Sequence, residues 1–162
     1  MRRKKNLEPR TAQCQAVHIT EPQALRGQWS GRFGRPAPLW LEIGCGKGRF
    51  ALQMARKYPQ INFVAVERDP SALLLAMEAA VKENLPNLLF LNWDAAQLDQ
   101  VFAPEEAERV FLNFSDPWPP KNRAKRRLTH RNFLAVYDRF LKPGGAIYMK
   151  TDNAKLFEFS LN

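Results

Sequence analysis

From residue 39 onward, short apolar runs alternate with longer amphipathic stretches. The apolar runs are nearly continuous, as in strands buried on both faces, and they cover residues 39–44, 61–67, 87–94, 109–116 and 146–152. The other stretches place apolar residues at helical spacing, and they cover residues 48–58, 69–84, 129–145 and 153–162. This alternation predicts an α/β fold with a mostly parallel sheet and helices on both of its faces.

Two of the predicted helices carry boundary signals. Asp69 is a suitable N-cap for the helix that follows it, and Pro70 fits the first helical position because it needs no N–H partner there. The helix that begins near Thr129 runs into Pro-Gly-Gly at residues 143–145. We expect that helix to stop at this triplet, since proline and glycine end helices.

The first 38 residues lack both patterns. They are polar, and the stretch SGRFGRPAP closes them with glycine and proline. We therefore expect a basic, poorly ordered N-terminal arm over residues 1–38, followed by one domain over residues 39–162.

Composition narrows the class of protein. Of the 162 residues, 45% are hydrophobic and 25% are charged, as in ordinary globular domains. No apolar run approaches the roughly 20 residues of a membrane span, and the charged N-terminus lacks the apolar stretch of a signal peptide. Cys14 and Cys45 do not form a CxxC pair. We expect a cytoplasmic protein without membrane contact, and the sequence leaves open whether it is a monomer or a homodimer.

Positive charge is concentrated in two blocks. The net charge is +9, and residues 1–35 and 121–142 hold most of the lysines and arginines, while the remainder is mildly acidic. Two basic blocks on an acidic body favour a polyanionic partner such as a nucleic acid. The alternative is a solubilising tail and a solvated helix face.

A glycine-rich turn follows the first predicted strand. Glycine permits a tight turn and a close approach to a ligand, and it recurs at alternate positions: Gly44, Gly46 and Gly48. Dinucleotide enzymes would require a further glycine at Arg49, so the turn departs from their fingerprint. Glu42 precedes the turn, and a carboxylate there suits a cofactor with an ammonium group better than one with phosphates. The turn therefore favours S-adenosylmethionine.

The next two strands also end in acids. Glu67 can accept hydrogen bonds from both hydroxyls of a ribose, and Asp94 can accept one from an adenine amino group. Ligands of open parallel sheets bind outside the carboxyl ends of the strands, where these acids meet Glu42. The three acids and the glycines predict an S-adenosylmethionine site, against the alternative of a structural turn with incidental acids.

The fourth predicted strand leads into Asp116, Pro117 and Trp118. Pro117 restricts the backbone beside the carboxylate, and Trp118 offers a flat face on which a base could stack. Basic side chains that could contact phosphates follow: Lys121, Arg123, Lys125, Arg126 and Arg127. We expect Asp152, at the end of the fifth strand, to face the same crevice. The alternatives are a turn acid at Asp116 and a core aromatic at Trp118.

Guanine fits this arrangement. Its N1–H and N2–H₂ groups donate to carboxylates, and its N7 already carries a free lone pair, so methylation there needs orientation rather than a base. A carboxylate that holds guanine also screens the positive charge that develops, which makes Asp116 the candidate catalytic residue. His18 and His130 lack partners at metal-ligand spacing, so we expect no metal.

The motifs LEIGCGKGRF, VERDPSAL, LNFSDPWPPKNRAKRRLTHRNFL and KTDNAKLFEFSL resemble the bacterial tRNA (guanine-N7-)-methyltransferases, from about Leu39 to Leu161. The resemblance implies a Rossmann-like class I methyltransferase fold that moves a methyl group from S-adenosylmethionine to N7 of guanosine in the tRNA variable loop. It also implies that Asp152 contacts the tRNA and that Asp116 is catalytic. The cofactor residues that it implies are Glu42, Glu67, Asp94 and Asp116.

The chain departs from this family at several places. The family lysine four residues after the DPW aspartate is Pro120 here, with Lys121 next to it, and a frequent histidine is Arg123. The family also continues beyond the position of Asn162. We therefore expect a methyltransferase domain without its last strands, which binds the cofactor weakly and whose activity is in question.

Three other functions stay open. Amino-group methyltransferases place a (D/N)PP-aromatic motif at the same strand end, whereas here Trp118 directly follows the first proline. A non-catalytic RNA-binding module on a truncated methyltransferase scaffold is a second possibility. A nicotinamide dehydrogenase is the third, and the missing glycine at Arg49 argues against it.

Overall fold

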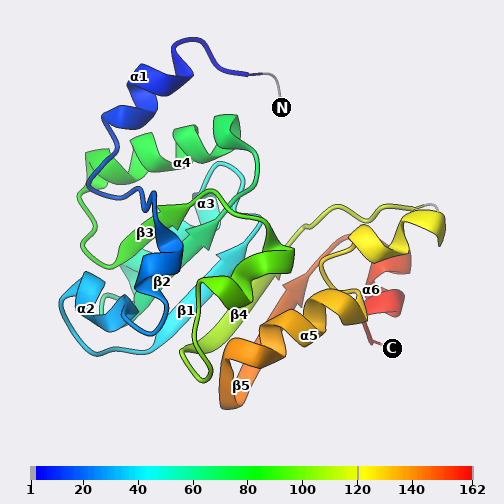
Figure 1. Cartoon of the computed structure of the whole chain (residues 1–162). Helices are drawn as coiled ribbons and strands as arrows, with labels where there is room; N and C mark the ends of the chain where they lie inside the picture. The colour runs from blue at the N-terminus through cyan, green and yellow to red at the C-terminus, as the bar shows by residue number, and fades with distance from the viewer. Residues whose placement is uncertain (1–2, 120, 162) are drawn as a thin grey trace.

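A five-stranded parallel sheet forms the centre of the molecule (Figure 1). The computed structural model describes residues 3–119 and 121–161, without the side chain of Lys121. The strand order is β3-β2-β1-β4-β5. The strands are β1 (Leu39–Ile43), β2 (Asn62–Val66), β3 (Leu88–Leu91), β4 (Ala107–Asn113) and β5 (Leu141–Lys150). Every residue of β1, β2 and β3 is buried, which confirms strands covered on both faces.

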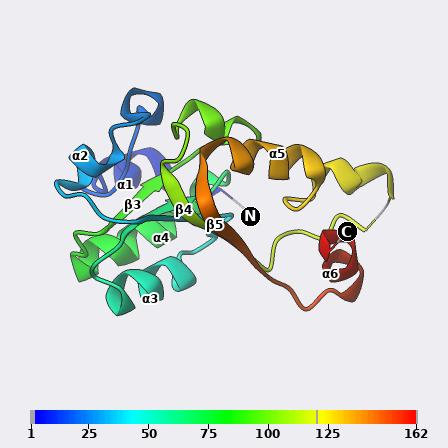
Figure 2. The same ribbon diagram turned by 90° about the horizontal axis from the view of Figure 1, so that it is seen from below.

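Helices cover both faces of this sheet, as predicted (Figure 2). Helices α3 (Arg49–Lys57) and α4 (Pro70–Glu83) pack on one face, in a core that contains Trp40 and Phe63. Helix α5 (Arg131–Phe140) and the 3₁₀ segment η2 (Ala95–Gln100) pack on the other face against Leu41. Successive residues of β1 belong alternately to one core and to the other, because successive side chains of a strand point to opposite faces.

The predicted N-cap of α4 is confirmed. Asp69 Oδ1 accepts a hydrogen bond from the Ser71 N–H at 2.9 Å, and Pro70 is the first helical residue. The expected C-terminal helix is α6 (Ala154–Leu161), which begins with a hydrogen bond from the Leu156 N–H to Asn153 Oδ1 at 2.8 Å. Local sequence signals place these two helix starts because the capping bonds join residues two or three positions apart.

The N-terminal segment packs on the domain, which differs from the poorly ordered arm expected over residues 1–38. It contains α1 (Leu7–Ala12), η1 (Pro22–Leu25) and α2 (Trp29–Phe33). Trp29 is only 1% exposed, and its Nε1–H donates to the Val101 carbonyl at 2.9 Å. Residues 17–19 also run beside β3, through a parallel bridge between His18 and Phe90. A few large apolar side chains dock this segment although they follow no helical or strand period.

The boundary between α5 and β5 also differs from the prediction. The helix ends at Phe140, and the Pro-Gly-Gly triplet lies inside β5 rather than at the end of the helix. The ladder with β4 is irregular here, because the register shifts between the pairs of Ala107 and Arg109. Gly144 has φ +80°, and a Cβ on Gly145 would lie 2.8 Å from the Glu108 carbonyl oxygen. The glycines therefore permit a β-bulge and a close approach of two strands.

Candidate active site

The carboxyl ends of the parallel strands border one large cavity. Its volume is about 580 Å³, within the range of small-molecule and cofactor sites. Residues at or after the ends of four strands line it, including Gly44, Glu67, Asp94 and Asp116. The structure therefore brings together predicted cofactor residues and the predicted catalytic residue at one edge of the sheet.

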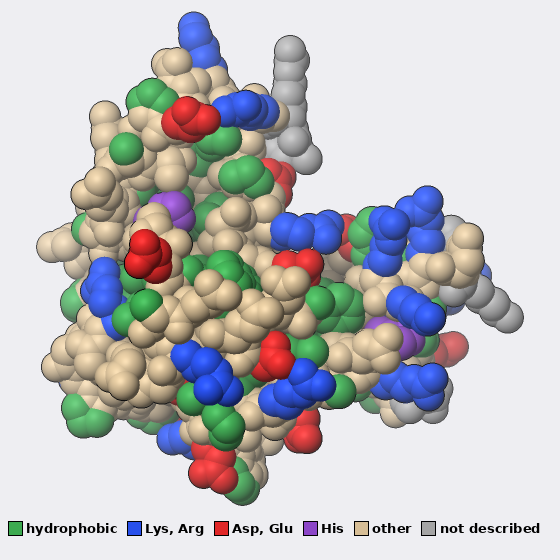
Figure 3. Space-filling view, in the orientation of Figure 1, with side chains coloured by type: hydrophobic (Ala, Val, Ile, Leu, Met, Phe, Trp, Pro, Cys, Tyr) green, Lys and Arg blue, Asp and Glu red, His purple; other side chains and the backbone are tan. Residues whose placement is uncertain are grey.

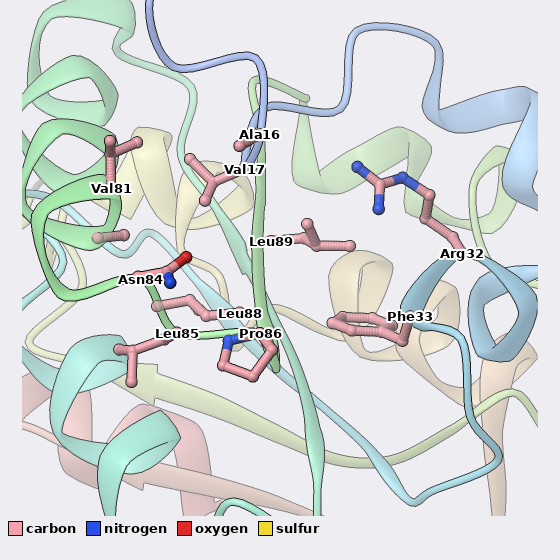
Figure 4. Close-up of a pocket in the computed structure, with 11 residues that line it drawn as sticks. Ala16, Val17, Arg32, Phe33, Val81, Asn84, Leu85, Pro86, Leu88 and Leu89 are labelled. Atoms are coloured by element: carbon pink, nitrogen blue, oxygen red, sulfur yellow. The ribbon is translucent and has the colours of Figure 1, made fainter.

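A second cavity, of about 210 Å³, lies elsewhere (Figure 4). Arg32 and Phe33 line one side of it, and Asn84 and Leu85 lie across from them. It borders the start of β3 and the C-terminal end of α4, so it lies toward the amino ends of the strands. None of the predicted site residues lines it, and the larger cavity is the candidate active site.

The glycine turn after β1 depends on its backbone conformation. Gly44, Gly46 and Gly48 all have positive φ, at 80°, 55° and 85°. A Cβ on Gly48 would lie 2.7 Å from the Cβ of Ala76, so this glycine also permits α3 to start against α4. Nothing lies within 4 Å of the Cβ position of Gly46, so this glycine presents open backbone.

Glu67 ties the glycine turn to the turn after β2. Its Oε1 accepts a hydrogen bond from the Gly46 N–H at 2.9 Å, and its Oε2 accepts one from the Asp69 N–H at 2.8 Å. Both oxygens also retain further lone pairs, because a carboxylate offers about four acceptor sites. Glu67 can therefore hold the two turns together and still accept from a ligand in the cavity that it lines.

Glu42 is 2% exposed, and one of its two carboxyl oxygens lacks a partner. Oε2 accepts a hydrogen bond from Asn113 Nδ2–H at 3.0 Å, whereas the buried Oε1 accepts none. Burial raises the pKa of this carboxyl to about 7, against the opposing effect of the Asn113 hydrogen bond, and the nearby charge of Glu67 raises it further. A buried acceptor without a donor is costly, so this atom is suited to a cationic or donating ligand group.

Asp94 lies at the start of η2. Its Oδ1 accepts a hydrogen bond from the Ala96 N–H at 2.9 Å, which makes it the N-cap of that segment. The residue is exposed and lines the cavity. It follows β3, which lies at the opposite side of β1 from β4, so Asp94 and Asp116 come from opposite halves of the sheet.

Asp116 and Trp118 line the other side of the cavity, after β4. Asp116 is exposed, and Trp118 adopts the left-handed backbone conformation with φ +42°. Among the predicted phosphate contacts, Arg126 also lines the cavity, and its guanidinium carbon lies 5.1 Å from the centroid of the Trp118 ring. Arg123 lies over the same ring at 5.9 Å. Trp118 and Arg126 therefore form part of the cavity wall, and Arg123, which does not line the cavity, contacts the same ring.

Arg127 points into its own loop. Its guanidinium donates to the carbonyl of Pro117 at 2.8 Å and to that of Trp118 at 3.0 Å, with a longer bond to Pro119. The same guanidinium lies 4.5 Å from the centroid of the Phe159 ring in α6. Its Nε and Nη2 donate within the chain, so the structure gives this residue a structural contact where the sequence suggested phosphate.

Two further predicted substrate residues are Asp152 and Lys121. Asp152 is exposed after β5 and does not line the cavity. Pro120 and the side chain of Lys121 lie outside the described residues. Lys and Arg side chains gather over the segment between β4 and α5, at the right of Figure 3, and η3 (Lys121–Arg126) contributes to them.

Sequence reasoning missed several residues in and around the site, and Asn113 and Phe114 are two of them. Asn113 holds Glu42 from the neighbouring strand, and Phe114 lines the cavity. Only the strand order puts Asn113 beside Glu42, so no local signal could have found it. Phe114 lies within the LNFSDPW motif, two residues before Asp116, and this proximity in sequence could have indicated that Phe114 belongs to the site.

The described residues fit S-adenosylmethionine on the grounds of their donors and acceptors. Gly44, Glu67 and Asp94 line a cavity of suitable volume, whereas Glu42, Gly46 and Gly48 do not line it. The buried oxygen of Glu42 lacks a donor behind this cavity, and nothing lies within 4 Å of the Cβ position of Gly46. Across residues 3–119 and 121–161, no His, Cys, Asp and Glu side chains cluster in a way that could hold a metal ion. Within the same residues, no helix has the length and apolarity to cross a membrane.

Comparison with solved structures shows the fold. The antibiotic-resistance methyltransferase Kmr aligns with a TM-score of 0.59 at 20% identity, over 80% of this chain and 70% of that one. A protein from Methanococcus maripaludis, described as a "putative s-adenosyl-l-methionine-dependent methyltransferase", aligns over 99% of this chain and 72% of that one, with a TM-score of 0.56 at 16% identity. The sheet therefore has the Rossmann-like methyltransferase fold.

Comparison with curated proteins shows the family. Residues 36–162 match the family described as "Putative methyltransferase". The tRNA (guanine-N(7)-)-methyltransferase of Geobacillus thermodenitrificans is 48% identical over 88% of this chain, which spans 66% of that protein. The enzyme of the same name from Lactiplantibacillus plantarum is 44% identical over 98% of this chain and 75% of its own length. This chain belongs to the tRNA (guanine-N(7)-)-methyltransferase family.

Proposed function

We propose that this chain transfers a methyl group from S-adenosylmethionine to N7 of guanosine in the variable loop of tRNA. One observation carries the proposal: Glu67, Asp94, Asp116 and Trp118 line the same cavity, beside basic side chains. Relatives named tRNA (guanine-N(7)-)-methyltransferase support the same substrate.

The cofactor would lie across the ends of β1, β2 and β3. Glu67 would accept from the ribose hydroxyls, and Asp94 would accept from the adenine amino group. The free oxygen of Glu42 would receive the ammonium group, because a cation relieves the cost of a buried carboxylate. When bound, the cofactor supplies an electrophilic methyl group on a sulfonium.

The guanine would lie over the ends of β4 and β5. Asp116 would accept from its Watson–Crick edge and hold N7 in line with the methyl group, which is the main requirement of this reaction. The same carboxylate would screen the positive charge that develops on the ring. Trp118 would stack on a base, and Lys125 and Arg126, which also line the cavity, would contact phosphates.

The deciding experiment incubates the purified chain with methyl-labelled S-adenosylmethionine and unmodified tRNA, and then identifies the labelled nucleoside. We expect label in N7-methylguanosine, with Asp116→Asn reducing the rate at least a hundredfold. Label in an exocyclic amino group, which does not give aniline-induced scission after reduction, would support the amino-group alternative. Binding of tRNA without label, unchanged in Asp116→Asn, would support a non-catalytic RNA-binding module.

A further inference from the structure

Phe114 is an exposed aromatic residue at the mouth of the candidate site. It directly follows β4, its side chain is 59% exposed, and it lines the large cavity. Its backbone has φ +52°, in the left-handed region that residues with a side chain rarely adopt. The chain thus holds a large apolar ring in a strained conformation without burying it, a combination that points to a ligand.

A backbone hydrogen bond, rather than side-chain packing, fixes the point from which this ring projects. The Phe114 N–H donates to the Lys150 carbonyl at 2.7 Å, which extends the contact between β4 and β5 by one residue. The ammonium of Lys150 lies 5.7 Å from the centroid of the ring, in a cation–π contact at the surface. The sheet therefore fixes the backbone of Phe114 at the mouth of the cavity, while most of the residue stays in contact with solvent.

Phe114 lies in the half of the cavity that we assign to the substrate. β4 is on the opposite side of β1 from β2 and β3, whose ends carry Glu67 and Asp94. Trp118, which also has positive φ, lines the same cavity four residues later, and Asp116 lies midway between the two in sequence. In the described part of the chain, neither ring is found stacked on the other.

We propose that Phe114 is a second stacking face for the target guanine, so that two aromatic rings flank the base whose edge Asp116 binds. Enzymes that modify a base take it out of its stack and hold it against aromatic or apolar side chains. This inference rests on the proposed function and adds a residue that determines how the base is held. The other exposed large apolar residues near β5 and α6, such as Tyr148 and Phe157, do not line the cavity.

Three substitutions of Phe114 test the proposal through tRNA affinity, measured by fluorescence anisotropy. Phe114→Tyr keeps a π face and should bind tRNA within about twofold of the unsubstituted chain. Phe114→Leu keeps apolar volume without a π face and should weaken binding about 5- to 150-fold. Phe114→Gly should weaken binding as much, while its thermal unfolding midpoint stays the same or rises, because glycine relieves the left-handed backbone.

Phe157→Leu is the matched control, since Phe157 is 49% exposed but lies outside the cavity, and its tRNA affinity should not change. Equal tRNA affinity of the Leu and Tyr variants would overturn the proposal. So would a lower unfolding midpoint in the Gly variant, equal loss in the control, or no measurable binding by the unsubstituted chain. Failure of the proposed function is distinguishable: it would appear as absent label in N7-methylguanosine while the Leu variant still lost tRNA affinity.

Discussion

Glu42 and Asn113 join the two central strands by a hydrogen bond of 3.0 Å between Oε2 and Nδ2. The bond crosses from β1 to β4, which are paired in parallel at the middle of the sheet. It satisfies one carboxyl oxygen and leaves the other buried without a partner. The pair therefore places one uncompensated acceptor at the edge of the sheet where the glycine turn begins.

This carboxyl should make stability depend on pH. Because the folded-state pKa of Glu42 is raised to about 7, the folded chain binds more protons than the unfolded chain between about pH 4.5 and 7. Stability should therefore fall as pH rises through this window. Glu42→Gln removes the effect, so its free energy of unfolding relative to the unsubstituted chain should increase by about 3 kcal/mol from pH 4 to pH 8. Urea titrations at both pH values measure this, and a constant difference would show a carboxylate that is already charged.

The glycine turn should tolerate no Cβ at Gly48. Gly48→Ala should destabilise the fold by about 2–4 kcal/mol, through its positive φ and its clash with Ala76. Gly34→Ala is the matched control, because Gly34 has φ +80° with nothing within 4 Å of its Cβ position, so only the conformational cost of about 1–2 kcal/mol applies. A double-mutant cycle with Ala76→Gly should recover about 1–3 kcal/mol. No coupling would mean that α3 moves away from α4 freely.

Glu67 should be needed as a double acceptor. Glu67→Gln offers one oxygen for the two N–H groups of Gly46 and Asp69, and its NH₂ group faces the other donor. We expect at least a tenfold loss of S-adenosylmethionine affinity by calorimetry. Glu106→Gln is the control, because Glu106 also uses both carboxyl oxygens away from the cavity: Oε1 accepts from the N–H groups of Gly27 and Ala103, and Oε2 accepts from that of Trp29. It should lower stability by about 1–3 kcal/mol without changing cofactor affinity, and equal affinity losses would show that the Glu67 effect is global.

Arg127 and Arg126 should differ in how they affect tRNA binding. Arg127→Lys keeps the charge but cannot reproduce the bonds to three carbonyls, so it should weaken tRNA binding without changing the slope of log affinity against log salt. Arg126→Ala should reduce that slope by about one, as expected for one lost phosphate contact. Affinities at several salt concentrations separate the two. The alternative, that Arg127 contacts phosphate, would be supported if Arg127→Ala reduced this slope while Arg127→Lys bound tRNA as tightly as the unsubstituted chain.

The sequence by itself determined the elements and the kinds of side chain at the strand ends. Continuous apolar runs identify β1, β2 and β3 because these strands are buried on both faces, and Asp69 marks the start of α4 because its capping bond is local. The same pattern locates the strand ends and so the acids that come after them. These acids are expected at one edge of the sheet, since the carboxyl ends of parallel strands share that edge.

Only the tertiary structure decided which partners these side chains have. Adjacent arginines in one basic run separate into Arg126, which lines the cavity, and Arg127, which holds the loop. The hydrogen bond that Glu42 Oε2 accepts comes from Asn113, a residue far away in the chain. The packing of Trp29 against Val101 and the bulge at Gly144 likewise depend on distant segments. Local propensity acts over a few residues, whereas these contacts depend on strand order and on the direction of each side chain, which only the folded sheet sets.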